Sequence, residues 1–139
     1  KNGIKKNKIE GDKSTPKGLF SLGKIYYRSD RVKKPKTRLK LVPIKKNMIW
    51  CNNPKSKYYN SETKISKICR YEKLFRNDYK YNYILIINYN KKQIPYKGSA
   101  IFLHLTKNYD PTAGCIGLKE KDFLILIRLI SKKTKIKIY

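Results

Sequence analysis

The chain contains one histidine, and a cysteine follows it at a short distance along the sequence. His104 lies in an apolar stretch, and Cys115 comes eleven positions later, directly after Gly114. An imidazole that contacts a thiol can take its proton and so activate the sulfur as a nucleophile. Gly114 lets the backbone turn sharply before the sulfur, so that the amides of Gly114 and Cys115 could stabilise an oxyanion. Cys115, His104 and Gly114 are therefore candidate catalytic residues.

A structural interpretation of the same residues competes with this one. A lone histidine within an apolar strand commonly serves the core, and a Gly-Cys pair alone has no specific meaning. The spacing of His104 and Cys115 therefore does not decide between the two interpretations. What decides is whether a strand that ends near His104 and a loop that returns through Cys115 bring both side chains to one point.

The elements that must position these residues are mainly short β-strands. Runs rich in Ile, Tyr, Phe and Thr alternate with turn segments rich in Asn, Asp, Pro, Ser and Gly. The turns are expected at residues 11–18, 52–61 and 108–114. Strands are expected at residues 18–27, 39–44, 83–89, 99–106 and 134–139.

One helix is predicted clearly, over residues 120–133. Its apolar positions, Phe123, Leu126, Ile127 and Ile130, have helical spacing, with acidic residues at the start and lysines at the end. Residues 70–79 are open to two interpretations, a second short helix or an ordered loop. The fold class is therefore mainly β, with one or two short α-helices, one of them near the C-terminus.

The composition describes a folded but strongly basic chain. There are 35 Lys and Arg against nine Asp and Glu in 139 residues, and the formal net charge is +26. Hydrophobic residues make up 40% and include twelve tyrosines, which argues against disorder. This length fits a single domain over residues 1–139. Such a field attracts anionic partners, although the even spread of the lysines among Asn, Ile and Tyr also suggests an AT-rich codon bias.

Three cysteines are too few for a disulfide scaffold, and no zinc-type spacing occurs. Cys51 and Cys69 could pair only if the fold brought their α-carbons within about 7 Å. The longest apolar run is too short to cross a bilayer. No signal peptide is recognisable, and because the sequence begins at Lys1 an upstream leader or anchor stays open.

Several segments together resemble the L,D-transpeptidase catalytic domain family, the YkuD type. His104 followed by Thr-Ala-Gly-Cys at 112–115 is similar to its active-site signature. "EGDKSTPKGLF" at 10–20 and "WCNNPKSKYYN" at 50–60 resemble two further blocks of these domains. A third block is matched by Glu72, Leu74, Arg76, Asp78 and Tyr81. The matches follow the expected order over nearly the whole chain.

The resemblance implies a YkuD-like β-sandwich or mixed sheet that cleaves peptidoglycan tetrapeptide stems. Cys115 would attack the carbonyl before the terminal D-alanine, with His104 as base and then acid, and an amine from a second stem or a protein would resolve the acyl-thioester. No cofactor or metal is expected, because the thiolate is the nucleophile. The acceptor for the other imidazole N–H is expected to be a backbone carbonyl or a hydroxyl such as Ser99 or Thr112.

The sequence departs from the family pattern at several positions. Gly117 stands where many members have Arg, Leu105 follows the histidine where many have Gly, and two asparagines replace the Asp pair after the Trp-Cys dipeptide. Arg76 and Arg70 are candidates to supply the missing charge. Trp50 is equally compatible with a core and a groove position. The candidate substrate-binding residues are Thr112, Arg76, Trp50, Tyr59 and Asn52.

Two other functions remain open at this point. The same site could transfer the acyl group to water, as an L,D-carboxypeptidase or peptidoglycan hydrolase. A basic polyanion-binding or nucleic-acid-binding module is the second alternative, although no recognised nucleic-acid motif occurs and no specific nucleic acid is expected. We expect a monomer in the periplasm or cell envelope without a transmembrane segment.

Overall fold

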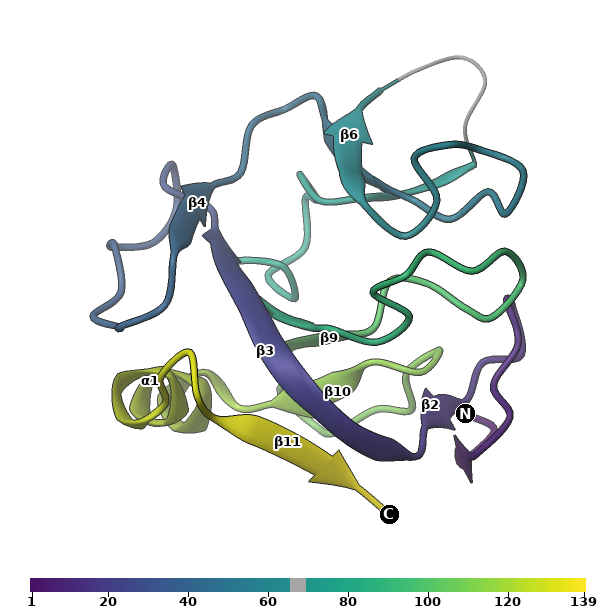
Figure 1. Ribbon diagram of the computed structural model, residues 1–139. Helices are drawn as coiled ribbons and strands as arrows, with labels where there is room; N and C mark the ends of the chain where they lie inside the picture. Colours follow the sequence, from purple (N-terminus) through teal and green to yellow (C-terminus); the bar gives the residue numbers. More distant parts are fainter. Residues whose placement is uncertain (66–69) are drawn as a thin grey trace.

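The computed structural model describes residues 1–65 and 70–139. It is mainly β, as the sequence predicts, with one helix in the described residues (Figure 1). The elements are β1 (Ile4–Lys5), β2 (Thr15–Pro16), β3 (Gly18–Tyr27), β4 (Leu41–Pro43), β5 (Met48–Cys51), β6 (Glu62–Lys64), β7 (Tyr71–Lys73), β8 (Tyr83–Ile87), β9 (Phe102–Leu105), β10 (Ile116–Leu118), α1 (Glu120–Leu129) and β11 (Lys135–Ile138). All five expected strands are present, most of them shorter than the sequence suggests.

The central sheet has the strand order β10-β9-β8-β3-β11, with β4 beside β3. Its strands β8 and β9 are buried on both faces, and successive side chains therefore contribute to two different apolar clusters. One set of alternating residues, which includes Ile25, Leu85 and Leu103, belongs to the larger of the two clusters, here called the main cluster. The second cluster takes the other set, among them Tyr26, Ile84 and Phe102.

The main cluster is covered by α1, where Phe123 and Ile127 are fully buried. The expected acidic first turn is present, because Glu120 and Asp122 lie there. The helix ends at Leu129, four residues before the predicted end, and Ile130 is extended. The reason is a turn in which the amide of Ser131 donates to Thr134 Oγ1 at 2.9 Å and starts the path into β11.

The second cluster lies between the central sheet and a small sheet with the order β6-β5-β7. Trp50 of β5 packs edge-to-face on Phe102 of β9, with ring centroids 5.2 Å apart. In Figure 1 this small sheet and α1 lie on opposite sides of β3. The pocket described below opens at the edge of this second layer.

The helical interpretation of residues 70–79 is wrong. Residues 71–73 form β7, which pairs with β5 so that Glu72 lies opposite Trp50. The segment then turns, and the Asp78 carboxylate accepts from the Lys80 amide at 2.9 Å. Pairing with a buried strand satisfies this backbone better than a short helix without a neighbour would.

Candidate active site

The strand register places His104 and Cys115 on the same face of the central sheet. β9 and β10 are parallel, and His104 is paired with Gly117. Side chains alternate along a strand, so Cys115 projects to the same side as Gly117 and therefore to the side of His104. In agreement, Ile116 packs against the main cluster and Cys115 against the second. Both side chains line one pocket of about 520 Å³.

The imidazole of His104 is held in one orientation. Its Nδ1 lies 2.9 Å from the carbonyl oxygen of Leu105, and because a carbonyl can only accept, Nδ1 carries the proton. Nε2 is then the nitrogen with the free lone pair. Burial lowers the pKa of His104 below its usual value, which keeps the ring neutral near pH 7. The acceptor of the imidazole N–H is therefore a backbone carbonyl, which is one of the acceptors that the sequence suggests.

The thiol of Cys115 is half-buried and hydrogen-bonded. Its Sγ lies 3.3 Å from the carbonyl oxygen of Ala100, to which the thiol donates. Burial raises the pKa of the Cys115 thiol to about 12. At rest the pair therefore consists of a neutral thiol and a neutral imidazole.

The turn before the nucleophile requires a glycine at position 114. Gly114 has φ +119°, and an added Cβ would lie 2.4 Å from the carbonyl oxygen of Ser14. The hydroxyl of Thr112 closes the turn, because it donates to the carbonyl of Cys115 and lies 3.3 Å from the donating amide of Gly114. Thr112 lines the pocket, but its hydroxyl is engaged within this turn.

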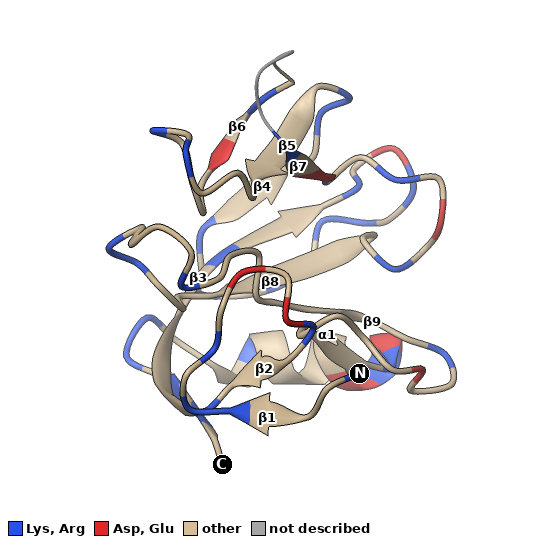
Figure 2. Cartoon of the chain, turned by 90° about the vertical axis from the view of Figure 1, so that its right-hand side faces the viewer, with Lys and Arg blue, Asp and Glu red and all other residues tan. Residues whose placement is uncertain are grey.

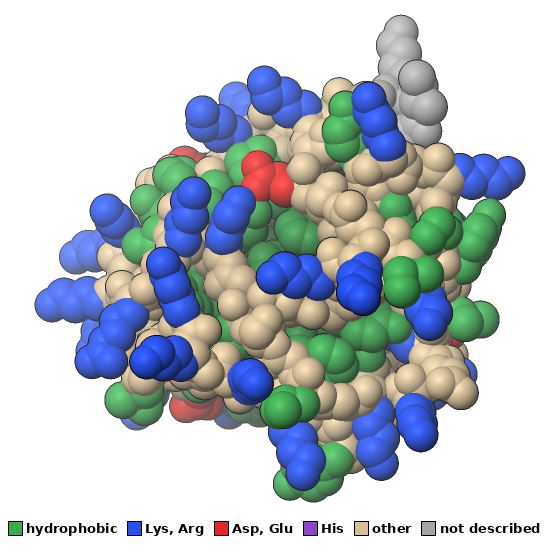
Figure 3. All heavy atoms as spheres, viewed as in Figure 1, with side chains coloured by type: hydrophobic (Ala, Val, Ile, Leu, Met, Phe, Trp, Pro, Cys, Tyr) green, Lys and Arg blue, Asp and Glu red, His purple; other side chains and the backbone are tan. Residues whose placement is uncertain are grey.

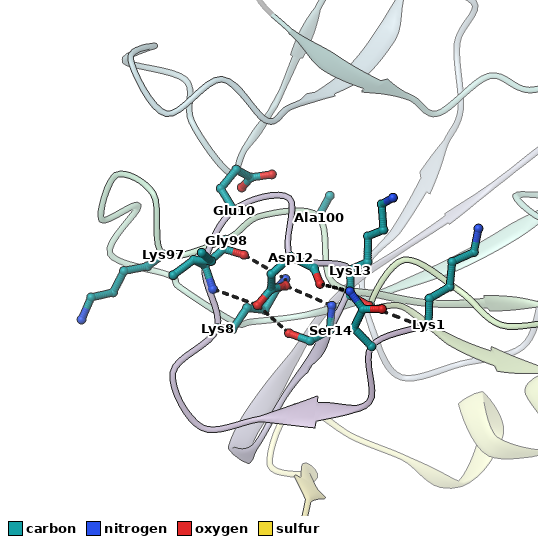
Figure 4. A network of polar contacts seen from close by, with 12 residues as sticks. Lys1, Lys8, Glu10, Asp12, Lys13, Ser14, Lys97, Gly98 and Ala100 are labelled. Atoms are coloured by element: carbon teal, nitrogen blue, oxygen red, sulfur yellow. Dashed lines mark hydrogen bonds and ion pairs between the residues drawn. The ribbon is translucent and has the colours of Figure 1, made fainter.

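The loop between β1 and β2 packs against this turn, because the carbonyl of Ser14 lies against Gly114. Figure 2 shows β1 and β2 side by side with the loop that joins them. The centre of this loop is Asp12, whose carboxylate accepts from Lys8 Nζ at 2.6 Å, from the Ser14 hydroxyl at 2.7 Å and from the Ser14 amide at 3.0 Å. Figure 4 shows Asp12 between Lys8 and Ser14. Burial alone would raise the pKa of Asp12, but these hydrogen bonds hold it well below its usual range. Asp12 thus fixes Ser14, whose carbonyl abuts Gly114.

The pocket lining includes Ser99 and Ala100, and the segment 98–100 that contains them is held by Tyr59 and Asn60. The Tyr59 hydroxyl accepts from the Gly98 amide at 2.9 Å and donates to Glu10 at 2.6 Å. Asn60 Oδ1 accepts from the Ala100 amide at 3.1 Å. Tyr59 is only 1% exposed, and neither Tyr59 nor Trp50 lines the pocket. Both are buried residues behind the pocket lining.

Arg76 and Asn52, in contrast, do line the pocket. The Arg76 guanidinium lies 3.1 Å from Glu72 and 2.5 Å from Asp78, and it stacks over Tyr81 at 4.8 Å. Its charge is therefore largely balanced by two carboxylates. The side-chain oxygen of Asn52 is buried without a hydrogen-bond partner in the described part of the chain.

The side chains that line the pocket carry a net positive charge, with two of the cations, Lys8 and Arg76, paired with carboxylates. Three acidic residues face six basic ones, and the full set is Glu10, Glu72, Asp110, Lys1, Lys8, Lys13, Arg70, Arg76 and Lys80. At Gly117, where the resembled family often has Arg, an added Cβ would lie 3.0 Å from Thr106 Cγ2. The positive lining thus comes from other segments than β10.

Sequence reasoning missed Ala100 as the acceptor of the thiol hydrogen bond and Ser14 as the support of Gly114. No residue pattern marks either position, because both act through backbone carbonyls. The suggested pairing of Cys51 with Cys69 falls outside the described residues, since residues 66–69 are not described.

Comparison with known protein families gives one match over nearly the whole chain. The model of the L,D-transpeptidase catalytic domain, YkuD, covers residues 3–138. Comparison with curated proteins and with solved structures gives no significant match. The match to residues 3–138 and the mainly β fold agree, and the chain belongs to the L,D-transpeptidase catalytic domain family.

Proposed function

We propose that the protein is a cysteine-dependent L,D-transpeptidase that acts on peptidoglycan tetrapeptide stems. The observation that carries the proposal is the placement of His104 and Cys115 on one sheet face, in one pocket, with Nε2 as the basic nitrogen. Residues 1–139 act as a single catalytic domain in the cell envelope, the usual site of the family's substrate. In the part of the chain that is described, no helix has the length and hydrophobicity to span a bilayer.

The first half-reaction forms an acyl-thioester. The Cys115 sulfur attacks the carbonyl of the third stem residue while its proton passes to His104 Nε2. The C–N bond to the terminal D-alanine then breaks, and the imidazolium returns the proton to the leaving amine. Because both groups are neutral at rest, proton transfer accompanies the attack.

The second half-reaction regenerates the thiol. An amine of a second stem or of a protein attacks the thioester carbonyl, His104 takes its proton, and the sulfur leaves and recovers a proton. The amides of Gly114 and Cys115 stabilise the oxyanion in both half-reactions, which requires the Gly114 amide to exchange its weak contact with Thr112 for the substrate oxygen.

The positive lining of the pocket favours a substrate that carries carboxylates. A stem peptide offers several carboxylates, and Lys80 and Lys13 are cations of the lining outside the ion pairs described above. Asn52 also lines the pocket and is a candidate to contact the stem peptide.

Intact-protein mass spectrometry after exposure to a carbapenem tests the nucleophile. The parent chain is expected to gain one covalent adduct that maps to Cys115, and Cys115→Ala is expected to gain none. His104→Ala serves as the second variant, with acylation slowed by at least about a hundredfold. An adduct on Cys51 or Cys69, or no adduct together with intact stem peptides, would refute the proposal.

Product analysis with a stem tetrapeptide separates transfer from hydrolysis. With an acceptor stem present, a cross-linked dimer is expected to exceed the free tripeptide. Tripeptide as the main product under the same conditions would instead identify an L,D-carboxypeptidase that uses the same thioester.

A further inference from the structure

Ala100 has a backbone conformation that its residue type disfavours. Its φ is +54°, in the left-handed region that costs energy for residues with a Cβ. Such strain persists only where neighbouring groups enforce it, and it is common beside reacting groups. The carbonyl of this residue accepts the hydrogen bond of the Cys115 thiol. The strained residue and the nucleophile are therefore in direct contact.

The group that enforces this conformation is the side chain of Asn60. Its Oδ1 accepts from the Ala100 amide at 3.1 Å and from Trp50 Nε1 at 2.9 Å. Its Nδ2 donates to the carbonyls of Tyr89 at 2.9 Å and Asn90 at 3.0 Å. Both lone pairs and both amide protons are thus used, so the carboxamide is fixed by four bonds to three other segments.

Two further features make the arrangement rigid. Asn60 itself has φ +52°, which asparagine tolerates better than most residues. The preceding Tyr59 holds the amide of Gly98, two residues before Ala100. The Tyr59-Asn60 pair therefore fixes both ends of the segment 98–100, which leads into β9 and its histidine.

We propose that Asn60 is a positioning residue that holds the Ala100 carbonyl as the resting acceptor of the Cys115 proton. The inference rests on the proposed function in that it takes Cys115 as the nucleophile. At rest the S–H bond points to Ala100, which stabilises the thiol against ionisation. When a substrate carbonyl reaches the sulfur, the S–H bond leaves Ala100 and the proton passes to His104 Nε2, with no other atom gained or lost.

This role makes the resting enzyme unreactive toward electrophiles that do not fit the pocket. Thiolates rather than thiols react with alkylating agents and oxidants, and a hydrogen bond donated by the thiol lowers the thiolate fraction. Loss of the Asn60 side chain then has two opposite effects. The sulfur becomes more reactive toward small reagents, and catalysis becomes slower because the sulfur is less well placed.

The test compares alkylation of Cys115 by iodoacetamide at pH 8, followed by peptide mass spectrometry, in the parent and in Asn60→Gly. Glycine keeps the positive φ at position 60 and removes all four bonds. Alkylation is expected to be about tenfold faster, equivalent to one pKa unit of the thiol. The kcat of the transfer reaction is expected to fall about tenfold with KM within about twofold, since the change affects positioning rather than binding.

Ala100→Gly in the Asn60→Gly background is the rescue variant. Glycine adopts the left-handed conformation without a penalty, so the carbonyl regains its place without Asn60. Alkylation is expected to slow toward the parent rate. Asn88→Ala is the matched control, because it removes an asparagine side-chain hydrogen bond, to Ser21 Oγ at 2.9 Å, in which neither Asn60 nor residues 98–100 take part. Its alkylation rate and kcat are expected to equal those of the parent.

The inference is overturned if Asn60→Gly alkylates like the parent, if Asn88→Ala shows the same acceleration, or if Ala100→Gly brings no rescue. A measurement on the parent alone covers the case in which Asn60→Gly does not fold. In the parent protein, iodoacetamide must alkylate Cys115 at least about tenfold more slowly than it alkylates the thiol of glutathione at the same pH. Alkylation needs no substrate, so failure of the transpeptidase reaction is distinguishable from failure of this inference.

Discussion

At the scale of the residue, the nucleophile depends on contacts with backbone atoms more than with side chains. The Cys115 thiol donates to one carbonyl, the His104 ring donates to another, and Gly114 lies against a third. Backbone carbonyls are fixed by the fold, so their positions change little when a surface residue changes. Mutations that move this backbone are therefore expected to affect catalysis more than mutations of the pocket lining.

Gly114→Ala tests the closest of these contacts. The added Cβ would lie 2.4 Å from the Ser14 carbonyl, and φ +119° is unfavourable for alanine. We expect a loss of about 2 to 4 kcal/mol in unfolding free energy and of at least about a hundredfold in kcat. Urea unfolding and carbapenem acylation measure the two quantities. Gly3→Ala, with positive φ and no atom within 4 Å of the added Cβ, is the control for strain alone. Equal losses in both variants would contradict the packing argument.

The pH dependence of acylation tests the protonation states at rest. His104 must be neutral to accept the proton, and burial lowers its pKa, so the rate is expected to fall only as the pH drops below the usual histidine value of about 6.5. The Cys115 thiol, with a pKa raised to about 12, stays protonated through neutral and mildly alkaline pH. The rate of carbapenem acylation is therefore expected to be flat from pH 7 to 9.

A preformed thiolate and imidazolium pair would behave differently. Its rate would decline above neutral pH as the imidazolium lost its proton, which gives a bell-shaped profile. A bell centred near pH 7 would therefore contradict the neutral resting pair. Use of the acylation step removes the titration of the acceptor amine from the measurement.

The candidate catalytic pair could be predicted from the sequence, because His104 and Cys115 lie within a recognisable motif. The groups that contact these two side chains in the absence of substrate could not be predicted from the sequence. Ala100 contributes only a carbonyl, and Asn60 is separated from Cys115 by 55 positions. Only the paired strands show that these segments meet.

At the scale of the element, the β1-β2 loop supports the nucleophile turn from outside. Lys8 and Asp12 form a buried ion pair in it, with side chains only 4% and 6% exposed. Removal of one partner from a buried pair leaves the other charge unpaired, which is more costly than replacement of both. The "EGDKSTP" block, residues 10–16, covers the second part of this loop and β2, and it supports Gly114 through the Ser14 carbonyl.

Asp12→Asn is expected to lower the unfolding free energy by about 3 kcal/mol at pH 7. The sign of the pH dependence follows from the lowered pKa of Asp12. Its stabilisation is present above the unfolded-state pKa near 4 and is lost as the pH falls toward the folded-state value. The difference between parent and variant, measured by urea unfolding, is therefore expected to shrink below pH 4. Lys8→Met with Asp12→Asn should cost less than the two single changes together, and a purely additive result would argue against a buried pair.

The strands and the helix were predictable to different degrees. The runs at 18–27 and 83–89 combine apolar and β-branched or aromatic residues, and they form the central strands β3 and β8. The segment 70–79 is ambiguous in the sequence because β5, the strand with which it pairs in the described chain, is distant in sequence. Short strands such as β6 and β10 have too few residues for a pattern, and they exist because a neighbouring strand pairs with them.

At the scale of the whole molecule, basic side chains far outnumber acidic ones. Figure 3 shows Lys and Arg side chains over the visible face, with acidic side chains at only a few places. The net charge is +26, and residues 31–61 contain no acidic residue. Like charges at this density repel one another and destabilise the compact state.

Salt is therefore expected to stabilise the protein. Raising KCl from about 20 mM to 500 mM screens the repulsion, and we expect the Tm to rise by several degrees at pH 7. Replacement of the exposed Lys33, Lys34 and Lys36 by Gln should raise the Tm at low salt and have less effect at high salt. A Tm that does not depend on KCl, measured by circular dichroism, would show that the charges are too well solvated to matter.

The division of the interior into two clusters has a consequence for inactivation. α1 belongs to the main cluster, whereas the sulfur of Cys115 and the small sheet belong to the second. Detachment of the small sheet would deprive the pocket of one wall and leave the helix in place. Native-state hydrogen exchange should then resolve two cooperative units, with the amides of β5 opening at lower urea than those of α1. Activity would therefore be lost when the small sheet opens, while most of the chain is still folded.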